Sequence, residues 1–300
     1  MTGNNIKSVL LTGATGFVGT NLLKSLVDCN YNISILKLAQ TNLPDNLINN
    51  KSINCYIYDG SNQSVEKVFN EISFDVVIHL ASLVLSSHDS DDIPKLVNSN
   101  ILFGTQLLEN MKANNVKFFI NTSTFWTHFN NEDYNPVNLY AATKKSFEDI
   151  LIYYHKAFNI SYITLELCDN YGLNDPRRKL FYWLKKSIDS KEVIAITEGE
   201  QVLSFVHISD VVNAYIIAME LISKESAVLS CNYAIRDKSI KIKDLVLLFE
   251  RISGKKLNIE MGARPYNTRE VMQTYNNCLI LPGWKPLVKL EDGVREIINE

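Results

Sequence analysis

Short apolar runs alternate with amphipathic stretches along the first half of the chain. Apolar residues recur at helical spacing within 17–27, whereas 75–81 is an apolar run of the kind that a parallel sheet buries on both faces. The strands are expected over 8–12, 32–36, 53–58, 75–81, 116–122 and 161–167, and the helices over 17–27, 65–72, 93–113 and 139–158. This alternation is typical of an α/β fold with a doubly wound parallel sheet that helices cover on both faces.

Beyond Asp169 the alternation loosens, and several prolines interrupt it. We therefore expect one large domain over 1–170 and a smaller C-terminal lobe formed mainly by 171–300. Within that second half, a strand over 202–207 and a helix over 210–222 have the pattern of main-sheet elements. We expect the segment 202–230 to return to the large domain.

Composition narrows the class of protein. The 300 residues are 46% hydrophobic and 21% charged, which permits a sizeable core and excludes disorder as the main state. A formal net charge of -3 leaves no global basic field for nucleic acid. The five cysteines are scattered and the histidines lack ligand spacing, so we expect neither disulfides nor a metal site, and a cytoplasmic location. No apolar run reaches eighteen residues, so no membrane-spanning helix is expected.

Three glycines follow the first predicted strand at intervals of three residues. The segment reads Thr12-Gly13-Ala14-Thr15-Gly16-Phe17-Val18-Gly19, between a strand and a helix. The first glycine allows a tight turn, the second lets the backbone approach a pyrophosphate, and the third permits close packing of helix on strand. The N-terminus of the following helix then directs N–H groups at the anion. The segment predicts a dinucleotide-binding turn of the Rossmann type.

A tyrosine and a lysine lie four residues apart at the start of the helix expected over 139–158. Tyr140 and Lys144 therefore share one face of that helix. A phenol with an ordinary pKa of about 10 exchanges protons poorly at neutral pH. A neighbouring ammonium stabilises the phenolate and lowers that pKa. The pair therefore predicts proton transfer next to a bound dinucleotide, with Lys144 also holding a ribose hydroxyl.

The glycine spacing with Thr12 before it, together with the Tyr140–Lys144 pair, resembles the extended short-chain dehydrogenase/reductase superfamily, also called the NAD-dependent epimerase/dehydratase family. The resemblance covers nearly the whole chain. It is closest to bacterial CDP-6-deoxyhexose 4-keto reductases of the abequose-synthase kind, which share the stretch from Asp210 to Tyr215. It implies a Rossmann-type sheet with a smaller substrate-binding lobe, and a role in surface-polysaccharide sugar biosynthesis.

The resemblance implies a third catalytic residue at the end of the strand that precedes Tyr140. Thr122 takes this position, and Ser123 is the alternative if the alignment shifts by one residue. The next two positions, Ser123 and Thr124, stand where sugar-nucleotide 4,6-dehydratases carry Asp and Glu. Without a carboxylate pair for eliminating water, a dehydratase is set aside, and reductase and epimerase remain.

The resemblance also implies the residues that hold the coenzyme: Gly13, Thr15, Gly16, Phe17, Val18, Gly19, Lys37, Asp59, Leu80, Ala81, Asn100 and Lys144. Lys37 stands at the end of the second strand, where NAD binders place an acid. Its cation favours a 2′-phosphate and so NADP(H), although it is equally a residue type expected at a solvated strand end. NADP(H) is therefore favoured and NAD(H) remains possible.

Contacts with a nucleotide-sugar substrate are expected from Ser82, Ser123, Thr124, Asp169, Arg177 and Arg264. Leu203 and Ser204 replace an Arg-Asp pair whose arginine normally holds the nucleotide phosphate. Arg264 matches a second phosphate-binding arginine of the family and is expected to compensate, together with Arg269 or Arg177. The acidic segment 87–92 would cap the following helix rather than hold a cation.

The sequence thus favours an NADP-dependent reductase of a 4-keto-6-deoxy sugar nucleotide, with Tyr140 as general acid. An epimerase that keeps a tightly bound NAD would use the same three residues. A non-catalytic NADP-binding regulator is the alternative of another class. Apolar outer helix positions at Leu102, Leu108, Ile150 and Tyr154 suggest a homodimer, unless the chain's own core uses them.

Overall fold

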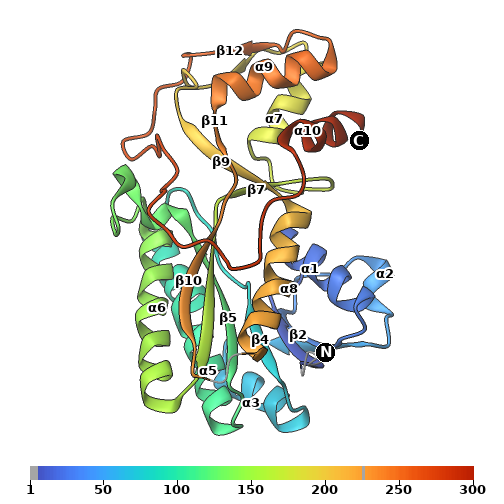
Figure 1. Ribbon diagram of the computed structural model, residues 1–300, viewed down its shortest axis with the longest axis vertical. Helices are drawn as coiled ribbons and strands as arrows, with labels where there is room; N and C mark the ends of the chain where they lie inside the picture. The colour runs from blue at the N-terminus through green and yellow to red at the C-terminus, as the bar shows by residue number, and fades with distance from the viewer. Residues whose placement is uncertain (1–5, 225–226) are drawn as a thin grey trace. The chain divides into compact units, whose positions relative to one another are not determined.

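The computed structural model describes residues 6–224 and 227–300 and contains a seven-stranded parallel sheet of Rossmann type (Figure 1). The strand order is β10-β6-β5-β4-β1-β2-β3. Their bounds are β1 Ser8–Thr12, β2 Asn32–Leu38, β3 Ile53–Tyr58, β4 Val76–His79, β5 Phe118–Thr124, β6 Ser161–Leu167 and β10 Ser230–Ile235. The α/β fold and the six strands of the first half are confirmed. The strand order reverses at β1 and β4, and ligands of such sheets bind beyond the strand ends at this point.

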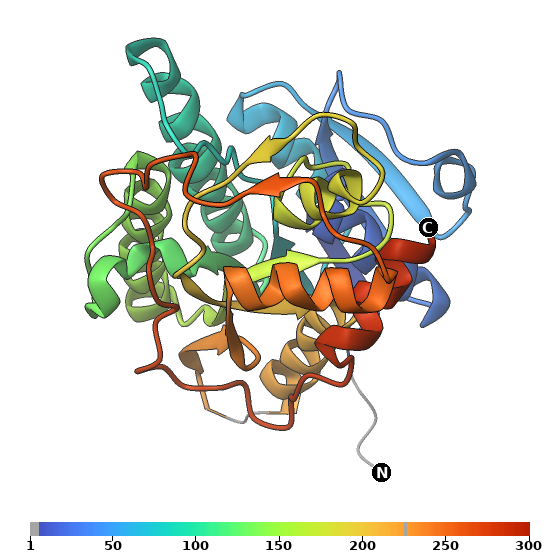
Figure 2. The ribbon, with the colours of Figure 1, turned by 90° about the horizontal axis from the view of Figure 1, so that it is seen from above.

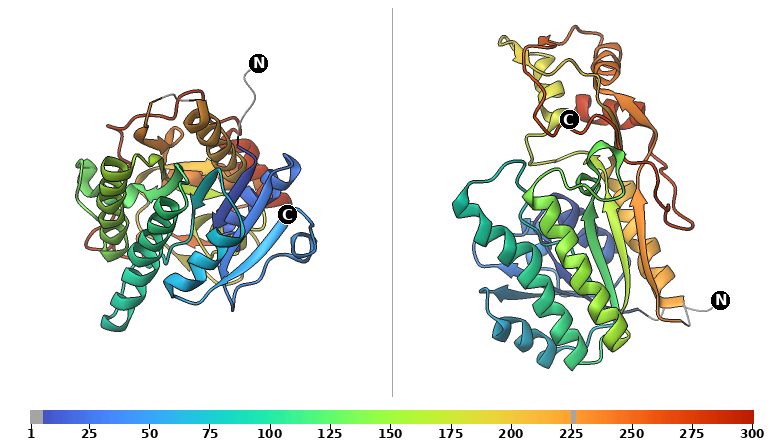
Figure 3. Two further views of the ribbon diagram at one scale, coloured as in Figure 1. Left: turned by 90° about the horizontal axis from the view of Figure 1, so that it is seen from below. Right: turned by 90° about the vertical axis from the view of Figure 1, so that its left-hand side faces the viewer.

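Helices cover both faces of this sheet because each presents an apolar stripe to it. On one face lie α3 (Asn62–Glu71), α5 (Phe103–Ala113) and α6 (Leu139–Phe158), and the last two run side by side (Figure 3, right). On the other face lie α1 (Phe17–Asp28) and α8 (Ile208–Lys224) (Figure 1).

The helix expected over 93–113 is interrupted by a π-helical segment, Asn98–Leu102, between α4 (Ile93–Val97) and α5. Leu108 and Tyr154 are buried in the core against the sheet, so these two outer positions serve the chain's own packing. One short helix, α2 (Asp45–Ile48), lies outside the expected elements. It is too short for its periodicity to stand out in the sequence.

The chain divides into two compact units. The first comprises Met1–Thr124, Asn138–Glu166 and Val212–Tyr233, and the second Phe125–Val137, Leu167–Val211 and Ala234–Glu300. The expectation that the strand over 202–207 returns to the main sheet was wrong. That strand, β9 (Val202–His207), pairs with β7 (Asp169–Tyr171) and β11 (Ser239–Lys241) in a separate sheet, and β10 joins the main sheet instead. A strand's own pattern does not specify its partners, which is why the sequence misled here.

The second unit has its own hydrophobic core, formed by β7, β9 and three helices. These are α7 (Leu180–Ser187), α9 (Ile242–Ser253) and α10 (Leu290–Asn299), and α9 packs against α10 (Figure 2). A two-stranded ladder joins β8 (Ile194–Ala195) to β12 (Ile259–Glu260). This unit therefore has the packing of an independent lobe.

Candidate active site

The turn between β1 and α1 has room only for glycine at two positions. Gly13 has a φ of 71°, and a Cβ there would lie 2.5 Å from the amide nitrogen of Ala81. A Cβ on Gly19 would lie 2.0 Å from the carbonyl oxygen of Gly13. Gly16 precedes α1 and donates its N–H to Gly13 at 3.1 Å. The loop thus folds tightly onto β4 and leaves the N-terminus of α1 open to an anion.

A cavity of about 880 Å³ lies beside this turn, in the first unit. Its size falls in the range of small-molecule and cofactor pockets. It is lined by eight residues of the expected site: Gly13, Thr15, Gly16, Lys37, Asp59, Leu80, Ala81 and Ser82. The expected Phe17, Val18, Gly19, Asn100 and Lys144 do not line it. The cavity and the glycine turn together fit a dinucleotide, with Phe17 buried in the packing that supports the turn.

Lys37 holds the loop that follows β2. Its ammonium donates hydrogen bonds to the carbonyl oxygens of Thr41, at 2.5 Å, and Leu38, at 3.3 Å. The side chain therefore folds beneath the turn rather than extending into solvent. It places a positive charge at the wall of the cavity, where NAD binders carry an acid.

Asp59 closes the turn between β3 and α3. Its carboxylate accepts hydrogen bonds from the N–H of Ser61 at 2.8 Å and from its hydroxyl at 2.6 Å. These bonds hold the pKa of the Asp59 carboxyl below its ordinary value, so the group stays ionised. Ser61 in turn caps α3 by accepting from the N–H of Ser64.

Asn100 connects three parts of the site from the π-helical segment. Its amide oxygen accepts from the Leu83 N–H at 2.8 Å and the Ser82 hydroxyl at 3.0 Å. Its amide nitrogen donates to Thr143, inside the Tyr140–Lys144 motif, and to the Leu83 carbonyl, both at 3.0 Å. All four bonding positions are used and the side chain is fully buried. Asn100 therefore fixes the loop after β4 to α6, and π-helical segments recur at such functional sites.

Tyr140 lies in the first turn of α6 and is buried. Asn138 caps this helix by accepting from the N–H of Ala141 at 3.0 Å. The Tyr140 hydroxyl is hydrogen-bonded to the side chains of Thr124 and Ser82. Burial raises the pKa of Tyr140 to about 12, although both hydrogen bonds act to lower it. At neutral pH the group is therefore a protonated phenol, which is the form that donates a proton.

Lys144 lies one turn further along the same face of α6 and is 1% exposed. Burial lowers the pKa of its ammonium to about 8, and the carboxylate of Glu148 opposes this shift. His79, at the end of β4, is also fully buried, and burial lowers its pKa well below the ordinary value, with Lys144 adding to that shift. His79 is therefore neutral, and its Nδ1 is 2.8 Å from the Thr12 hydroxyl.

Alternation along β5 sends its terminal hydroxyls to different partners. Thr122 lies 2.7 Å from the hydroxyl of Tyr215 on α8, and Thr124 is bonded to Tyr140. Ser123 points to the other face and donates to the carboxylate of Glu148. The structure thus brings Tyr140 together with Thr124 and Ser82, whereas Thr122 bonds Tyr215 and Ser123 bonds Glu148.

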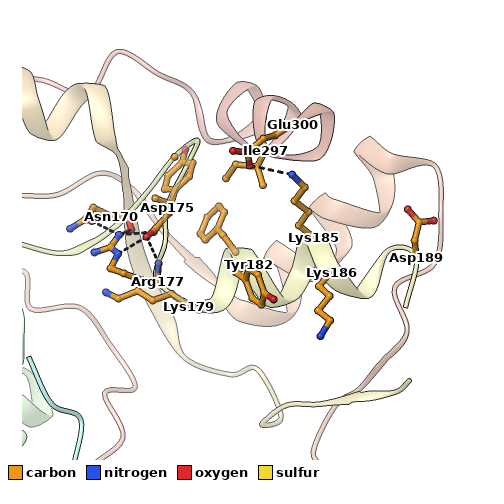
Figure 4. A pocket seen from close by; sticks show the side chains of 13 residues that line it. Asn170, Asp175, Arg177, Lys179, Tyr182, Lys185, Lys186, Asp189, Ile297 and Glu300 are labelled. Carbon is orange, nitrogen blue, oxygen red and sulfur yellow. Dashed lines mark hydrogen bonds and ion pairs between the residues drawn. The ribbon is translucent and has the colours of Figure 1, made fainter. Parts of the chain in front are cut away.

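The second unit contains a cavity of about 410 Å³. Of the expected substrate residues, Arg177 lines this cavity. Asp169 does not, although its neighbour Asn170 does. Figure 4 shows the guanidinium of Arg177 directed at Asp175 and Asn170. It is 2.7 Å from an oxygen of Asp175 and donates to the amide oxygen of Asn170 at 2.7 Å. Asp169 pairs with Lys179 at 3.4 Å. Charges at this cavity are thus largely compensated by partners within the unit.

The two other candidate phosphate-binding arginines differ sharply. Arg269 donates to the carbonyl oxygens of Pro136 and Val137, at 2.9 and 3.1 Å, and its guanidinium lies 4.2 Å from the ring centre of Phe129. Arg264 is exposed, and its side chain has no recorded hydrogen bond or ion pair in the described part of the chain. Leu203, which replaces the usual arginine, packs against the core of the second unit. Arg264 is therefore the arginine with a charge still available to an anion.

Two residues of the site were missed by sequence reasoning. Glu148 is four residues after Lys144 and therefore on the same helix face, so the spacing itself carried a signal. It accepts from Ser123, pairs with Lys145 at 3.0 Å and raises the pKa of Lys144. Tyr215 ends the stretch from Asp210 that the resemblance shares, but nothing in the sequence gave it a role, because its contact with Thr122 follows from the packing of α8 on the sheet.

Metal-binding and membrane-spanning features do not occur in the described residues. Within 6–224 and 227–300, no group of three or more His, Cys, Asp and Glu is placed to hold a metal ion. Within the acidic segment 87–92, reciprocal bonds between Asp89 and Asp92 cap the short 3-10 turn Ser90–Asp92. The expected cap on the following helix, α4, is not formed, because Asp92 at its N-terminus makes no side-chain capping bond there. Among the described helices, none has the length and apolar character needed to cross a membrane.

Comparisons with known proteins agree on one family of sugar-nucleotide enzymes. The model of the NAD dependent epimerase/dehydratase family matches residues 9–229. CDP-abequose synthase from Salmonella muenchen is 29% identical over 302 residues, which covers 98% of this chain and 97% of that protein. UDP-glucuronate 4-epimerase from Thermodesulfobacterium geofontis is 26% identical, covering 97% and 94%. The solved UDP-glucose 4-epimerase of Thermus thermophilus, in complex with NAD, has the same fold, with a TM-score of 0.81 at 20% identity over 97% of this chain and 98% of that one.

Proposed function

The chain belongs to the NAD dependent epimerase/dehydratase family, and from that premise we propose that it is an NADP-dependent reductase of a 4-keto-6-deoxy sugar nucleotide. The coarser assignment, an NAD(P)-dependent enzyme of sugar-nucleotide chemistry, follows from the family and its relatives. One observation carries the finer choice of a reductase, the similarity to CDP-abequose synthase over nearly the whole chain. The proton transfer itself is supported by Tyr140, a buried, protonated phenol held by Thr124 and Ser82 on the same helix face as Lys144.

The cavity beside Gly13, Gly16 and Lys37 would hold the coenzyme, which would supply the hydride for the carbonyl carbon of the 4-keto sugar. Tyr140 gives its phenolic proton to the carbonyl oxygen as that oxygen becomes an alkoxide, and the product is an alcohol. The ammonium of Lys144 stabilises the phenolate that remains. Thr122 donates a hydrogen bond to the same substrate oxygen.

NADPH is proposed over NADH because of the charge at the end of β2. At that strand end the cavity wall carries the Lys37 ammonium in place of an acid, and the carboxylate of Asp59, after β3, is occupied by hydrogen bonds from Ser61. A 2′-phosphate is attracted by that ammonium, whereas NAD lacks the group. The similarity to CDP-abequose synthases from three bacteria, at 26 to 29% identity, supports reduction rather than epimerisation.

Purified protein should oxidise NADPH in proportion to the alcohol formed when it is given CDP- or dTDP-linked 4-keto-6-deoxy sugars. Tyr140→Phe should abolish this oxidation and leave the dissociation constant of NADPH within about threefold, because the lost hydroxyl serves proton transfer. Tyr154→Phe is the matched control, since Tyr154 is on the same helix and its hydroxyl bonds Glu109 at 2.8 Å, away from the site. Full activity of Tyr140→Phe would refute the assignment.

An epimerase is the second candidate, and a curated relative favours it. The UDP-glucuronate 4-epimerase of Thermodesulfobacterium geofontis is 26% identical over nearly the whole chain. Such an enzyme would be purified with oxidised NAD in place, and would interconvert sugars without net consumption of coenzyme. Mass spectrometry of the coenzyme released on denaturation therefore separates the two functions.

A homodimer is also proposed. Ile152 and Tyr153 are 41 and 58% exposed on α6, as expected of a face that a second copy covers. Leu102, another expected outer position, lines the cavity proposed for the coenzyme instead. Light scattering after size exclusion should give twice the mass of the chain, and the mass of a single chain would refute the dimer.

A further inference from the structure

Two phenols flank the end of β5, and the function proposed above uses only Tyr140. The other, Tyr215, is fully buried on α8. Its hydroxyl is 2.7 Å from the hydroxyl of Thr122. Within residues 6–224 and 227–300, Thr122 is the side-chain hydrogen-bond partner of the Tyr215 hydroxyl. Thr122 itself is only partly buried, and alternation along β5 places it on the same face as Thr124, which is bonded to Tyr140.

The direction of this hydrogen bond follows from the burial of the two groups. A phenolic O–H that is buried without an acceptor loses about 1–3 kcal/mol. Burial, more than the nearby Tyr140, raises the pKa of Tyr215 above its ordinary value, so the phenol keeps its proton. That proton is therefore donated to Thr122, whose own O–H is left free to point away from α8.

In this arrangement the orientation of Tyr140 and the orientation of Thr122 are fixed by different partners. Tyr140 is bonded to Thr124 and Ser82, so its orientation does not depend on Thr122. Thr122 is oriented from the opposite side of the sheet by Tyr215. The hydroxyl of Thr122 is thus held by a fully buried residue, Tyr215.

We propose that Tyr215 is a positioning residue that makes Thr122 a hydrogen-bond donor toward the substrate oxygen. By donating to Thr122, Tyr215 fills one lone pair of that hydroxyl and leaves its proton for the oxygen that becomes an alkoxide. This proposal rests on the proposed function. It adds that the correct orientation of Thr122 is set by a side chain 93 residues away in the sequence.

A double-mutant cycle tests it. Tyr215→Phe removes one oxygen and keeps the ring, and should lower kcat about tenfold, less than the loss of a direct oxyanion donor. The KM for the sugar nucleotide and the Kd for NADPH should stay within about threefold, because both are set by other contacts. In a Thr122→Val background, Tyr215→Phe should have no further effect, since the hydroxyl that it orients is gone. Tyr154→Phe is the matched control, because Tyr154 is buried and its hydroxyl bonds Glu109 at 2.8 Å, away from the site.

A purely structural role for Tyr215 would instead lower kcat equally in both backgrounds, in step with the melting temperature. An active wild-type enzyme with an unchanged Tyr215→Phe variant would overturn this proposal alone. A wild-type protein that oxidises no NADPH with any 4-keto sugar would overturn the proposed function, and this proposal with it.

If Tyr215→Phe does not fold, 3-fluorotyrosine at position 215 keeps both ring and hydroxyl and makes the phenol a stronger donor. We then expect kcat to change at least about twofold, and no change from the same substitution at Tyr154. An unchanged kcat for the position 215 variant would overturn the proposal.

Discussion

Replacing the buried lysine of the site should make the protein more stable while destroying its activity. Lys144 is 1% exposed, and burial lowers the pKa of its ammonium from 10.5 to about 8. At neutral pH the folded protein must therefore keep a charge in a poorly solvated place, whereas the unfolded chain exposes the same charge to water. Lys144→Met retains the length of the side chain and removes that charge.

The magnitude follows from the shift in pKa. A drop from 10.5 to about 8 corresponds to about 3 kcal/mol, at about 1.4 kcal/mol for each unit. Because the folded pKa is the lower one, the unfolded chain binds more protons between pH 8 and 10.5, and stability rises with pH across this window. The destabilisation is fully present below pH 8, and it shrinks by about 1 kcal/mol between pH 7 and pH 9.

Chemical denaturation of the coenzyme-free protein at pH 7 and pH 9 measures both effects. Lys144→Met should raise the free energy of unfolding by about 2–3 kcal/mol at pH 7, and by about 1 kcal/mol less at pH 9. Lys145→Met is the matched control, because Lys145 is partly exposed and pairs with Glu148 at 3.0 Å. Its loss should lower stability. A Lys144→Met variant no more stable than wild type, or equally stabilised at both pH values, would refute this reasoning.

Three further substitutions test the coenzyme site. Gly19→Ala places a Cβ 2.0 Å from the carbonyl oxygen of Gly13. It should lower the free energy of unfolding by more than about 2 kcal/mol and weaken NADPH binding. Unfolding and a Kd like those of the wild type would contradict that packing. Asn100→Ala removes the bonds to Leu83, Ser82 and Thr143. It should lower the free energy of unfolding by about 2–4 kcal/mol, measured by denaturant titration. An unchanged free energy of unfolding would show that those bonds do not stabilise the fold. Lys37→Asp should raise the Kd for NADPH relative to the Kd for NADH by at least about tenfold, measured by titration of each coenzyme. An unchanged ratio would show that Lys37 does not select the coenzyme.

The sequence determined those features that arise within short stretches of chain. Periodicity predicted the strands and helices of the first half because burial on one face or both leaves a repeat in the residues themselves. The glycine turn and the spacing of Tyr140 and Lys144 were readable for the same reason. The second unit was predicted poorly, because its strands are short and β9 carries no mark of the sheet that it joins.

Tertiary structure alone decided which side chains are engaged and which are open. Thr122 bonds Tyr215, Arg269 supports the loop before α6, and Arg177 is held by Asp175, whereas Arg264 stays exposed. None of these outcomes follows from residue type, since any of the three arginines could hold a phosphate. A hydrogen bond joins atoms that folding brings together from distant segments, and burial decides whether a group keeps its charge. The sequence therefore predicted which residues are candidates for the site, whereas packing determined which partners each of them has.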